Sequence, residues 1–156
     1  MAELRIGFVE SNEMIRAGRT MLVNSQQDMK VVFEESDPRV ALEKIADYLV
    51  DVIIVAQSQP GFSGFQMVSK MVATLKIQGN SAQVLVCAPF KSDQARWGAI
   101  SSGAADLVGL DESGTEFLRI LRKVSKLDYT VDSTFLNEFG ATVPSKELSR
   151  KLETHL

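Results

Sequence analysis

The residues best placed for chemistry are acids and hydroxyls at the ends of apolar runs. Glu10 closes one such run, Asp111 and Glu112 follow another, and Ser58 and Ser63 lie in a loop that also contains proline and glycine. Carboxylates from two strand ends that meet can hold a cation, and a serine can act as a nucleophile when a base activates it. No base lies near either serine in the sequence. If Asp111 or Glu112 reached Glu10, the two carboxylates would give a weak cation site at best.

The residue at the centre of this arrangement is an alanine. Val52 to Val55 is an unbroken apolar, β-branched run, which is typical of a strand buried on both faces of a parallel sheet. Ligands and chemistry in an open α/β sheet gather at the carboxyl end of a central strand. Ala56 occupies that end. It offers no acid, no nucleophile and no metal ligand.

The single cysteine and the single histidine add no reactive site. Cys87 sits inside an apolar run, which predicts a buried structural thiol, and a lone cysteine excludes an internal disulfide. His155 lies one residue from the end of the sequence, which argues against histidine-based catalysis or a histidine metal site. We therefore expect no metal, no cofactor and no enzymatic activity, and a reducing, cytoplasmic location.

Composition narrows the class of protein. The 156 residues suit one domain, and 45% hydrophobic with 24% charged residues is ordinary for a globular protein. A net charge of −3 gives no support for a basic nucleic-acid-binding surface. No apolar stretch approaches the roughly 20 residues that a membrane helix needs, and the charged first strand does not resemble a signal peptide.

Strand and helix patterns alternate five times, which predicts an α/β fold with a doubly wound parallel sheet. Helix starts are marked by Asn12, Asp37, Ser92 and Ser113, and Gly103 marks a helix stop. The first helix shows an apolar stripe at Met14, Ala17, Gly18, Met21 and Leu22, which we expect to face the sheet. The expected strands are 5–10, 29–34, 52–55, 83–88 and 106–110, and the helices between and after them include Leu49, Met67, Met71 and Phe117 among their apolar residues.

The pattern changes after Leu127. Residues 129–139 read as a connector with one helical turn, and residues 145–156 as a final helix with Leu148, Leu152 and Leu156 along one stripe. We expect residues 127–156 to be a linker or helical extension, with any output domain absent or truncated. Residues 143–152 faintly resemble the second helix of a LuxR-type helix-turn-helix, but no recognition helix follows them.

Several phrases, in order, resemble a response-regulator receiver domain of the CheY-like kind. They are IGFVESNEMIRAG after the first strand, PGFSG after the third, and SGAADLVG into the fifth. They are similar to the receivers of LuxR/FixJ-type transcription factors over residues 4–126. The resemblance implies a flavodoxin-like strand order 2-1-3-4-5, with the site between strands one and three.

In an active receiver, a phosphoryl group moves to an aspartate with the help of Mg²⁺, a lysine and a hydroxyl. The resemblance places the phosphoacceptor position at Ala56 and the acidic pair at Glu10 and Ser11. It places the hydroxyl at Ala88, with Cys87 beside it, the lysine at Leu110 and the switch aromatic at Leu107. Nearly every functional position therefore carries a group that cannot do its task, and we expect a receiver without phosphorylation.

Partner contacts are the remaining expectation. Arg96 and Trp97 lie on the fourth helix, where receivers commonly bind partners, and tryptophan and arginine are favoured at interfaces. Simple packing of Trp97 is an equal alternative. We expect a homodimer or a protein partner, DNA contact only through an output domain not present in this chain, and no membrane contact.

These observations raise three candidate functions, and they disfavour the third. The first is a signalling or transcriptional regulatory module that works by phosphorylation-independent dimerisation or docking. The second is a small-ligand sensor at the less polar edge around Ala56. A flavin carrier or enzyme is disfavoured because the loop after the first strand lacks a phosphate-binding cradle.

Overall fold

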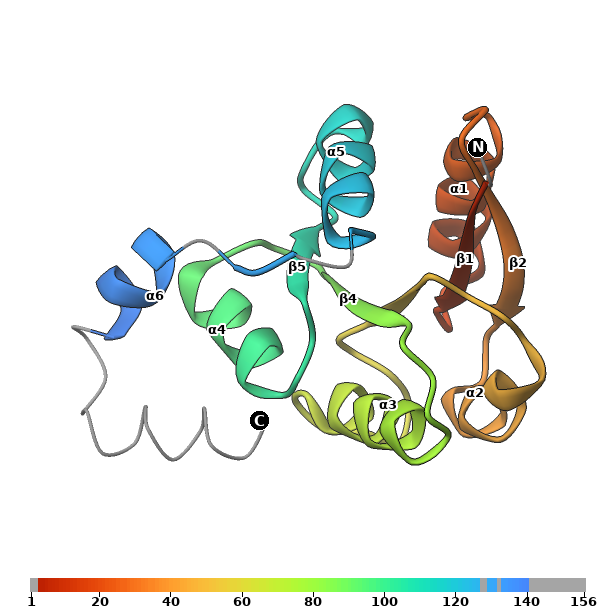
Figure 1. Ribbon diagram of the computed structural model, residues 1–156, viewed down its shortest axis with the longest axis horizontal. Helices are drawn as coiled ribbons and strands as arrows, with labels where there is room; N and C mark the ends of the chain where they lie inside the picture. Colours follow the sequence, from red (N-terminus) through yellow and green to blue (C-terminus); the bar gives the residue numbers. More distant parts are fainter. Residues whose placement is uncertain (1–2, 127–128, 132, 141–156) are drawn as a thin grey trace.

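The computed structural model describes residues 3–126, 129–131 and 133–140 (Figure 1). A five-stranded parallel sheet has the order β2-β1-β3-β4-β5, which confirms the predicted fold and topology. Its strands are β1 (Leu4–Val9), β2 (Met29–Glu35), β3 (Val52–Ala56), β4 (Gln83–Ala88) and β5 (Asp106–Gly109). The helices are α1 (Glu13–Asn24), α2 (Pro38–Lys44), α3 (Gln66–Ile77), α4 (Asp93–Ser101), α5 (Gly114–Val124) and α6 (Ser133–Gly140), with a 3₁₀ turn η1 (Ile45–Asp47) after α2.

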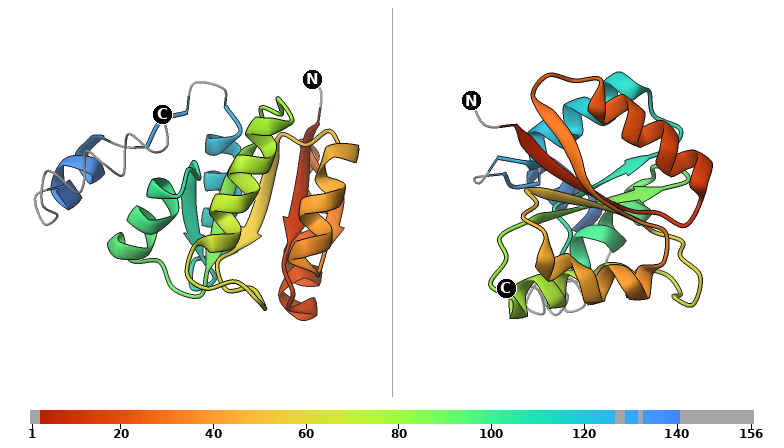
Figure 2. Two further views of the ribbon diagram at one scale, coloured as in Figure 1. Left: turned by 90° about the horizontal axis from the view of Figure 1, so that it is seen from below. Right: turned by 90° about the vertical axis from the view of Figure 1, so that its right-hand side faces the viewer.

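Helices cover both faces of the sheet, with α1 and α5 on one side and α2, α3 and α4 on the other (Figures 1 and 2). Alternate residues of each central strand enter two separate cores. Ile53 and Val55 of β3 pack towards α3, whereas Val52 and Ile54 pack towards α5. This double burial explains why the run from Val52 to Val55 is uniformly apolar.

The predicted helix starts are confirmed by side-chain caps. Asn12 Oδ1 accepts a hydrogen bond from Ile15 N at 3.0 Å, and Ser113 Oγ accepts one from Glu116 N at 3.1 Å. Asp37 and Ser92 cap α2 and α4 in the same way. Each cap satisfies a backbone donor that the helix itself leaves unpaired. The stop after α4 is also confirmed, because Gly103 has φ of +101°.

The predicted inner face of α1 is wrong. Met14 and Met21 are 85% and 74% exposed, and Ala17 and Gly18 are exposed as well. The helix turns Ile15, Leu22 and Val23 inwards together with Arg16 and Arg19. Both arginines bury their stems while their charged ends find partners, so a pattern based on apolar residues alone misplaces the face.

Two smaller differences concern the following elements. Leu49 is 73% exposed because α2 ends at Lys44 and the chain continues as η1, which changes the helical phase. The connector is more ordered than expected: α6 spans Ser133–Gly140, and Phe135 on it is buried. The predicted final helix and His155 lie outside the described residues.

Candidate functional site

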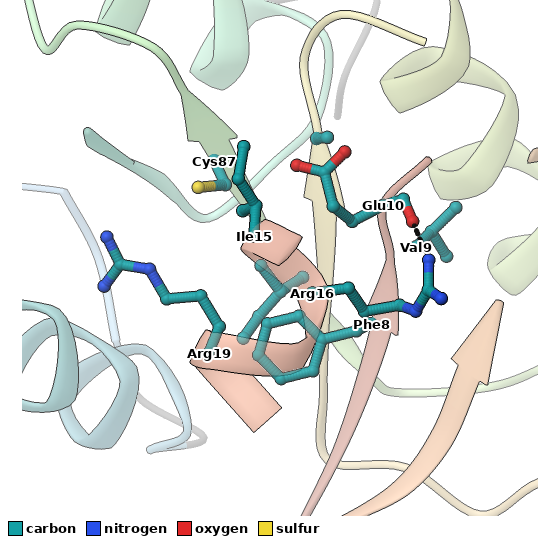
Figure 3. Close-up of a pocket in the computed structure, with 9 residues that line it drawn as sticks. Phe8, Val9, Glu10, Ile15, Arg16, Arg19 and Cys87 are labelled. Atoms are coloured by element: carbon teal, nitrogen blue, oxygen red, sulfur yellow. Dashed lines mark hydrogen bonds between the residues drawn. The ribbon is translucent and has the colours of Figure 1, made fainter. Parts of the chain in front are cut away.

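The carboxyl ends of β1, β3 and β4 meet at one edge of the sheet. Val9 pairs with Val55 across β1 and β3, and Ala56 pairs with Cys87 across β3 and β4. Glu10 directly follows Val9, so its carboxylate reaches towards the end of β3, and Figure 3 shows Glu10 and Cys87 on either side of this edge. The structure therefore brings Glu10, Ala56 and Cys87 together.

Glu10 is a buried acid with a local partner. Glu10 is only 8% exposed, and its Oε2 accepts a hydrogen bond from the backbone N–H of Asn12 at 3.1 Å. Burial raises the pKa of the Glu10 carboxyl above its ordinary value, although the N–H groups of Asn12 and Ser11 and the charge of Arg16 oppose the shift. Ser11, the second position of the expected acidic pair, is half-buried and brings no carboxylate.

Two long side chains join the elements around this edge. Arg16 Nη1 donates to the Glu10 carbonyl at 2.7 Å (Figure 3), and Arg16 Nε lies 3.6 Å from Glu34 Oε1. Gln59 Nε2 donates to the Val9 carbonyl at 2.9 Å, from the loop after β3. Hydrogen bonds and one ion pair thus connect the ends of β1, β2 and β3. Sequence reasoning missed both residues, because neither bond has a local sequence signature.

Cys87 carries an unreactive thiol. It is 7% exposed, and burial raises its pKa to about 11 from the ordinary value of 9.0, with nearby Arg19 acting in the opposite direction. Since the thiolate is the reactive form, a thiol with this pKa stays protonated at neutral pH. The prediction of a buried structural cysteine is confirmed.

A small pocket lies where these side chains converge. Phe8, Ile15 and Ile54 form its wall with Ala56 and Cys87. Its free volume is about 10 Å³, which is about the space that one water molecule needs. A metabolite does not fit this cavity, so the structure gives no observation in favour of the small-ligand sensor at this edge.

The hydroxyl and aromatic positions lie on the other face of the sheet. Ala88 and Leu107 are fully buried in the core beneath α3 and α4. Leu110 packs partly against the opposite core, and its backbone N–H donates to the Ala88 carbonyl at 2.8 Å. Backbone bonding and apolar packing thus account for all three positions. Cys87, rather than Ala88, is the strand partner of Ala56.

The acids after β5 have partners near their own loop. Asp111 Oδ1 accepts from Lys91 N at 3.3 Å, and Glu112 Oε1 accepts from Gly109 N at 2.9 Å. Glu112 Oε2 also lies 3.6 Å from Lys91 Nζ. Within the described ranges, no group of three or more histidine, cysteine or acidic side chains could hold a metal ion.

The Mg²⁺ site that the receiver resemblance implies does not fit these residues. Among the residues that the structure describes, Glu10 is the one carboxylate lining the pocket at the junction of β1 and β3. It already accepts a backbone hydrogen bond, and the cationic Arg16 lies beside it. Mg²⁺ sites use carboxylate and other oxygen ligands in near-octahedral geometry. Ser11 and Ala56 do not complete such a set with carboxylates.

The expected partner residues on α4 are occupied within the chain. Trp97 is 3% exposed, which fits the packing alternative. Arg96 makes a bidentate ion pair with Asp106, with Nε to Oδ1 at 2.8 Å and Nη2 to Oδ2 at 3.0 Å. Its guanidinium also lies over the Phe135 ring of α6, 4.3 Å from the ring centre.

Comparison with known proteins finds a regulatory protein of similar sequence. No protein-family model matches the chain. Over 164 residues it is 26% identical to the oxygen regulatory protein NreC of Staphylococcus aureus, and the match covers 95% of this chain and 73% of NreC.

Solved structures share the fold. The signal receiver domain of the putative response regulator NarL from Mycobacterium tuberculosis has a TM-score of 0.70 at 21% identity, covering 80% of this chain and 98% of that one. A two-component response regulator of the LuxR family from Aurantimonas has a TM-score of 0.74 at 17% identity, covering 90% and 98%. No helix in the described parts of the chain is long and apolar enough to cross a membrane.

Proposed function

We propose that this CheY-like receiver domain, related to NarL/LuxR-family response regulators, acts in signal transduction by binding protein partners without phosphorylation. The single observation that carries the proposal is the pairing of Ala56 with Cys87 at the end of β3. Phosphoryl transfer to a receiver needs a carboxylate nucleophile, and neither a methyl group nor a buried, protonated thiol replaces it. The domain is accordingly a binding module rather than an enzyme.

The polar groups around this edge support the proposal, because they already have partners within the chain and need no bound phosphoryl group. Arg16 and Gln59 bind the carbonyls of Glu10 and Val9, and Lys91 pairs with Glu112 in the loop after β5. A doubly negative phosphoryl group placed there would approach the buried Glu10 carboxylate, and like charges at short range repel strongly in a poorly solvated site. Because this repulsion opposes a phosphorylated state, we expect the edge to keep a single conformation.

Exposed apolar side chains support association with another protein. Met14 and Met21 lie on α1 and are 85% and 74% exposed. Met14 also borders a shallow groove with Leu110 and Gly114, between α1 and the start of α5. Methionine side chains adapt to varied partners, and apolar surface removed from water stabilises an interface. We propose that this surface binds a second copy of the chain.

Light scattering over a range of protein concentrations tests the proposal. The association state should be the same with and without Mg²⁺ and acetyl phosphate, because no phosphoprotein forms. The double variant Met14→Glu/Met21→Glu should weaken association at least tenfold. Ile77→Glu is the matched control, since Ile77 is 88% exposed on α3. Association that requires the phosphate donor would refute the proposal.

A further inference from the structure

A cluster of four side chains fastens the segment after α5 to the surface formed by α4 and β5. Its members are Arg96 of α4, Asp106 of β5, Tyr129 and Phe135 of α6. Figures 1 and 2 both show α6 beside α4, on the side of the molecule away from α1. These contacts join residues that are far from the edge around Ala56.

Asp106 is the centre of the cluster. The residue is 5% exposed, and its carboxylate accepts hydrogen bonds from Arg96 Nε and Nη2, from its neighbour Leu107 N at 2.7 Å, and from the Tyr129 hydroxyl. A buried carboxylate is costly unless it is paired and hydrogen-bonded. Arg96 and Leu107 already supply three of these bonds from within α4 and β5, so the Tyr129 bond can open while the charge stays paired.

Phe135 covers the outer face of the same ion pair. The Arg96 guanidinium lies over its ring at 4.3 Å, and Phe135 is 7% exposed. Tyr129 packs on the core beneath α5, with Lys123 Nζ 5.8 Å from the centre of its ring. Cation–ring contacts of this kind are individually modest. The described contacts of the segment include a hydroxyl bond and two aromatic contacts, and these can break without removing a strand or a helix of the sheet layers.

We propose that Arg96, Asp106, Tyr129 and Phe135 form a latch, which holds the segment from Tyr129 through α6 on the α4–β5 surface and can open while the sheet stays folded. In the closed state, Arg96 is used inside the chain and is not available to a partner. In the open state, the Arg96–Asp106 pair becomes accessible on α4 and β5, and Tyr129 and α6 leave this surface. Because the latch joins α4 to α6, a contact made by α6 would affect the position of α4. The latch does not depend on whether Ala56 replaces a phosphoacceptor.

The test compares Tyr129→Phe, Phe135→Ala and the double variant in the full 156-residue chain. Tyr48→Phe is the matched control, because it removes the other tyrosine hydroxyl at a ring that packs on Phe33 near β2. The readouts are trypsin cleavage after the exposed Lys126, exchange of the hydrogen-bonded Tyr129 amide and of the amides in β3, and the urea midpoint of unfolding.

Loss of a hydrogen bond to a charged group should raise opening about tenfold or more. We expect cleavage after Lys126 and exchange of the amide at position 129 to rise by that factor in Tyr129→Phe, and further in the double variant. Exchange in β3 and the urea midpoint should stay close to those of the Tyr48→Phe control.

Two results would overturn the latch. One is unchanged cleavage and exchange in both single variants, which would mean that the cluster does not hold the segment. The other is an equal rise in exchange at the amide of position 129 and in β3, because the segment would then unfold only together with the sheet.

Discussion

Gln59 and Val9 are joined by a hydrogen bond of 2.9 Å from the side-chain amide of Gln59 to the backbone carbonyl of Val9. The bond links the loop after β3 to the end of β1. Gln59 is only 5% exposed, and its Oε1 is buried without a hydrogen-bond partner among the described residues. One end of the amide therefore stabilises the edge and the other end costs free energy.

These opposing effects predict different outcomes for two substitutions. Gln59→Met keeps the volume, loses one bond worth about 1 kcal/mol and removes the unpaired oxygen, so the free energy of unfolding should change by less than about 1 kcal/mol. Gln59→Ala also loses the packing of the side chain and should cost about 2–3 kcal/mol. Urea denaturation measures both. A loss for Gln59→Met as large as that for Gln59→Ala would show that the amide bond, not packing, dominates.

Glu10→Gln should stabilise the domain at neutral pH. Because burial raises the pKa of Glu10 in the folded state, the stability associated with its protonated form is present below the unfolded pKa near 4.5 and is lost as the pH rises through the folded pKa. Glutamine imitates the protonated form at all pH values. We expect a gain of up to about 1 kcal/mol at pH 7 that disappears below pH 4.

Urea denaturation at both pH values measures this difference. The substitution Glu43→Gln, at an exposed position of α2, serves as the control for the removal of one carboxylate. A destabilised Glu10→Gln protein at pH 7 would mean that the ionised carboxylate contributes more to the edge through Asn12 and Arg16 than its burial costs.

The Cys87 thiol should resist alkylation while the protein is folded. Its pKa of about 11 leaves a negligible thiolate fraction at pH 7.5, and the side chain is buried. Labelling by iodoacetamide should be at least a hundredfold slower than in 6 M urea, as measured by intact mass. Labelling of the native chain at the rate of a free thiol would contradict the burial of Cys87 next to Ala56.

Two glycines inside helices should respond to alanine in opposite directions. Nothing surrounds the added methyl group at Gly18 of α1, so Gly18→Ala should stabilise by about 1 kcal/mol through helix propensity. At Gly98 of α4 the methyl group would overlap the ring of Phe65, and overpacking costs about 1–3 kcal/mol. Thermal unfolding should therefore rise for the first variant and fall for the second. Equal rises would mean that Phe65 moves aside freely.

The sequence patterns that succeeded are those whose cause is local. Apolar runs with turn residues after them predicted the strands, and a polar side chain two or three residues before a helical N–H predicted the caps at Asn12 and Ser113. Both signals act between neighbours in the chain. They were sufficient to obtain the strand order once the receiver resemblance was added.

The features that the sequence did not predict depend on contacts between residues that are distant in the sequence. Arg16 and Arg19 replace Met14 and Met21 on the inner side of α1 because Glu10, Glu34 and Phe117 offer them partners. Tyr129 reaches Asp106 across 23 residues, and Gln59 reaches Val9 across 50. Periodicity does not contain such pairings, so neither the latch nor the joined edge could be predicted from the sequence.

The central claim is that the edge around Ala56 takes up no phosphoryl group. Intact-mass spectrometry after incubation with Mg²⁺ and acetyl phosphate tests it directly, with a receiver that carries the acceptor aspartate as a positive control. We expect an unchanged mass for this chain under conditions that phosphorylate the control. A stoichiometric gain of about 80 Da, mapped to any residue at the carboxyl ends of β1, β3 or β4, would contradict it.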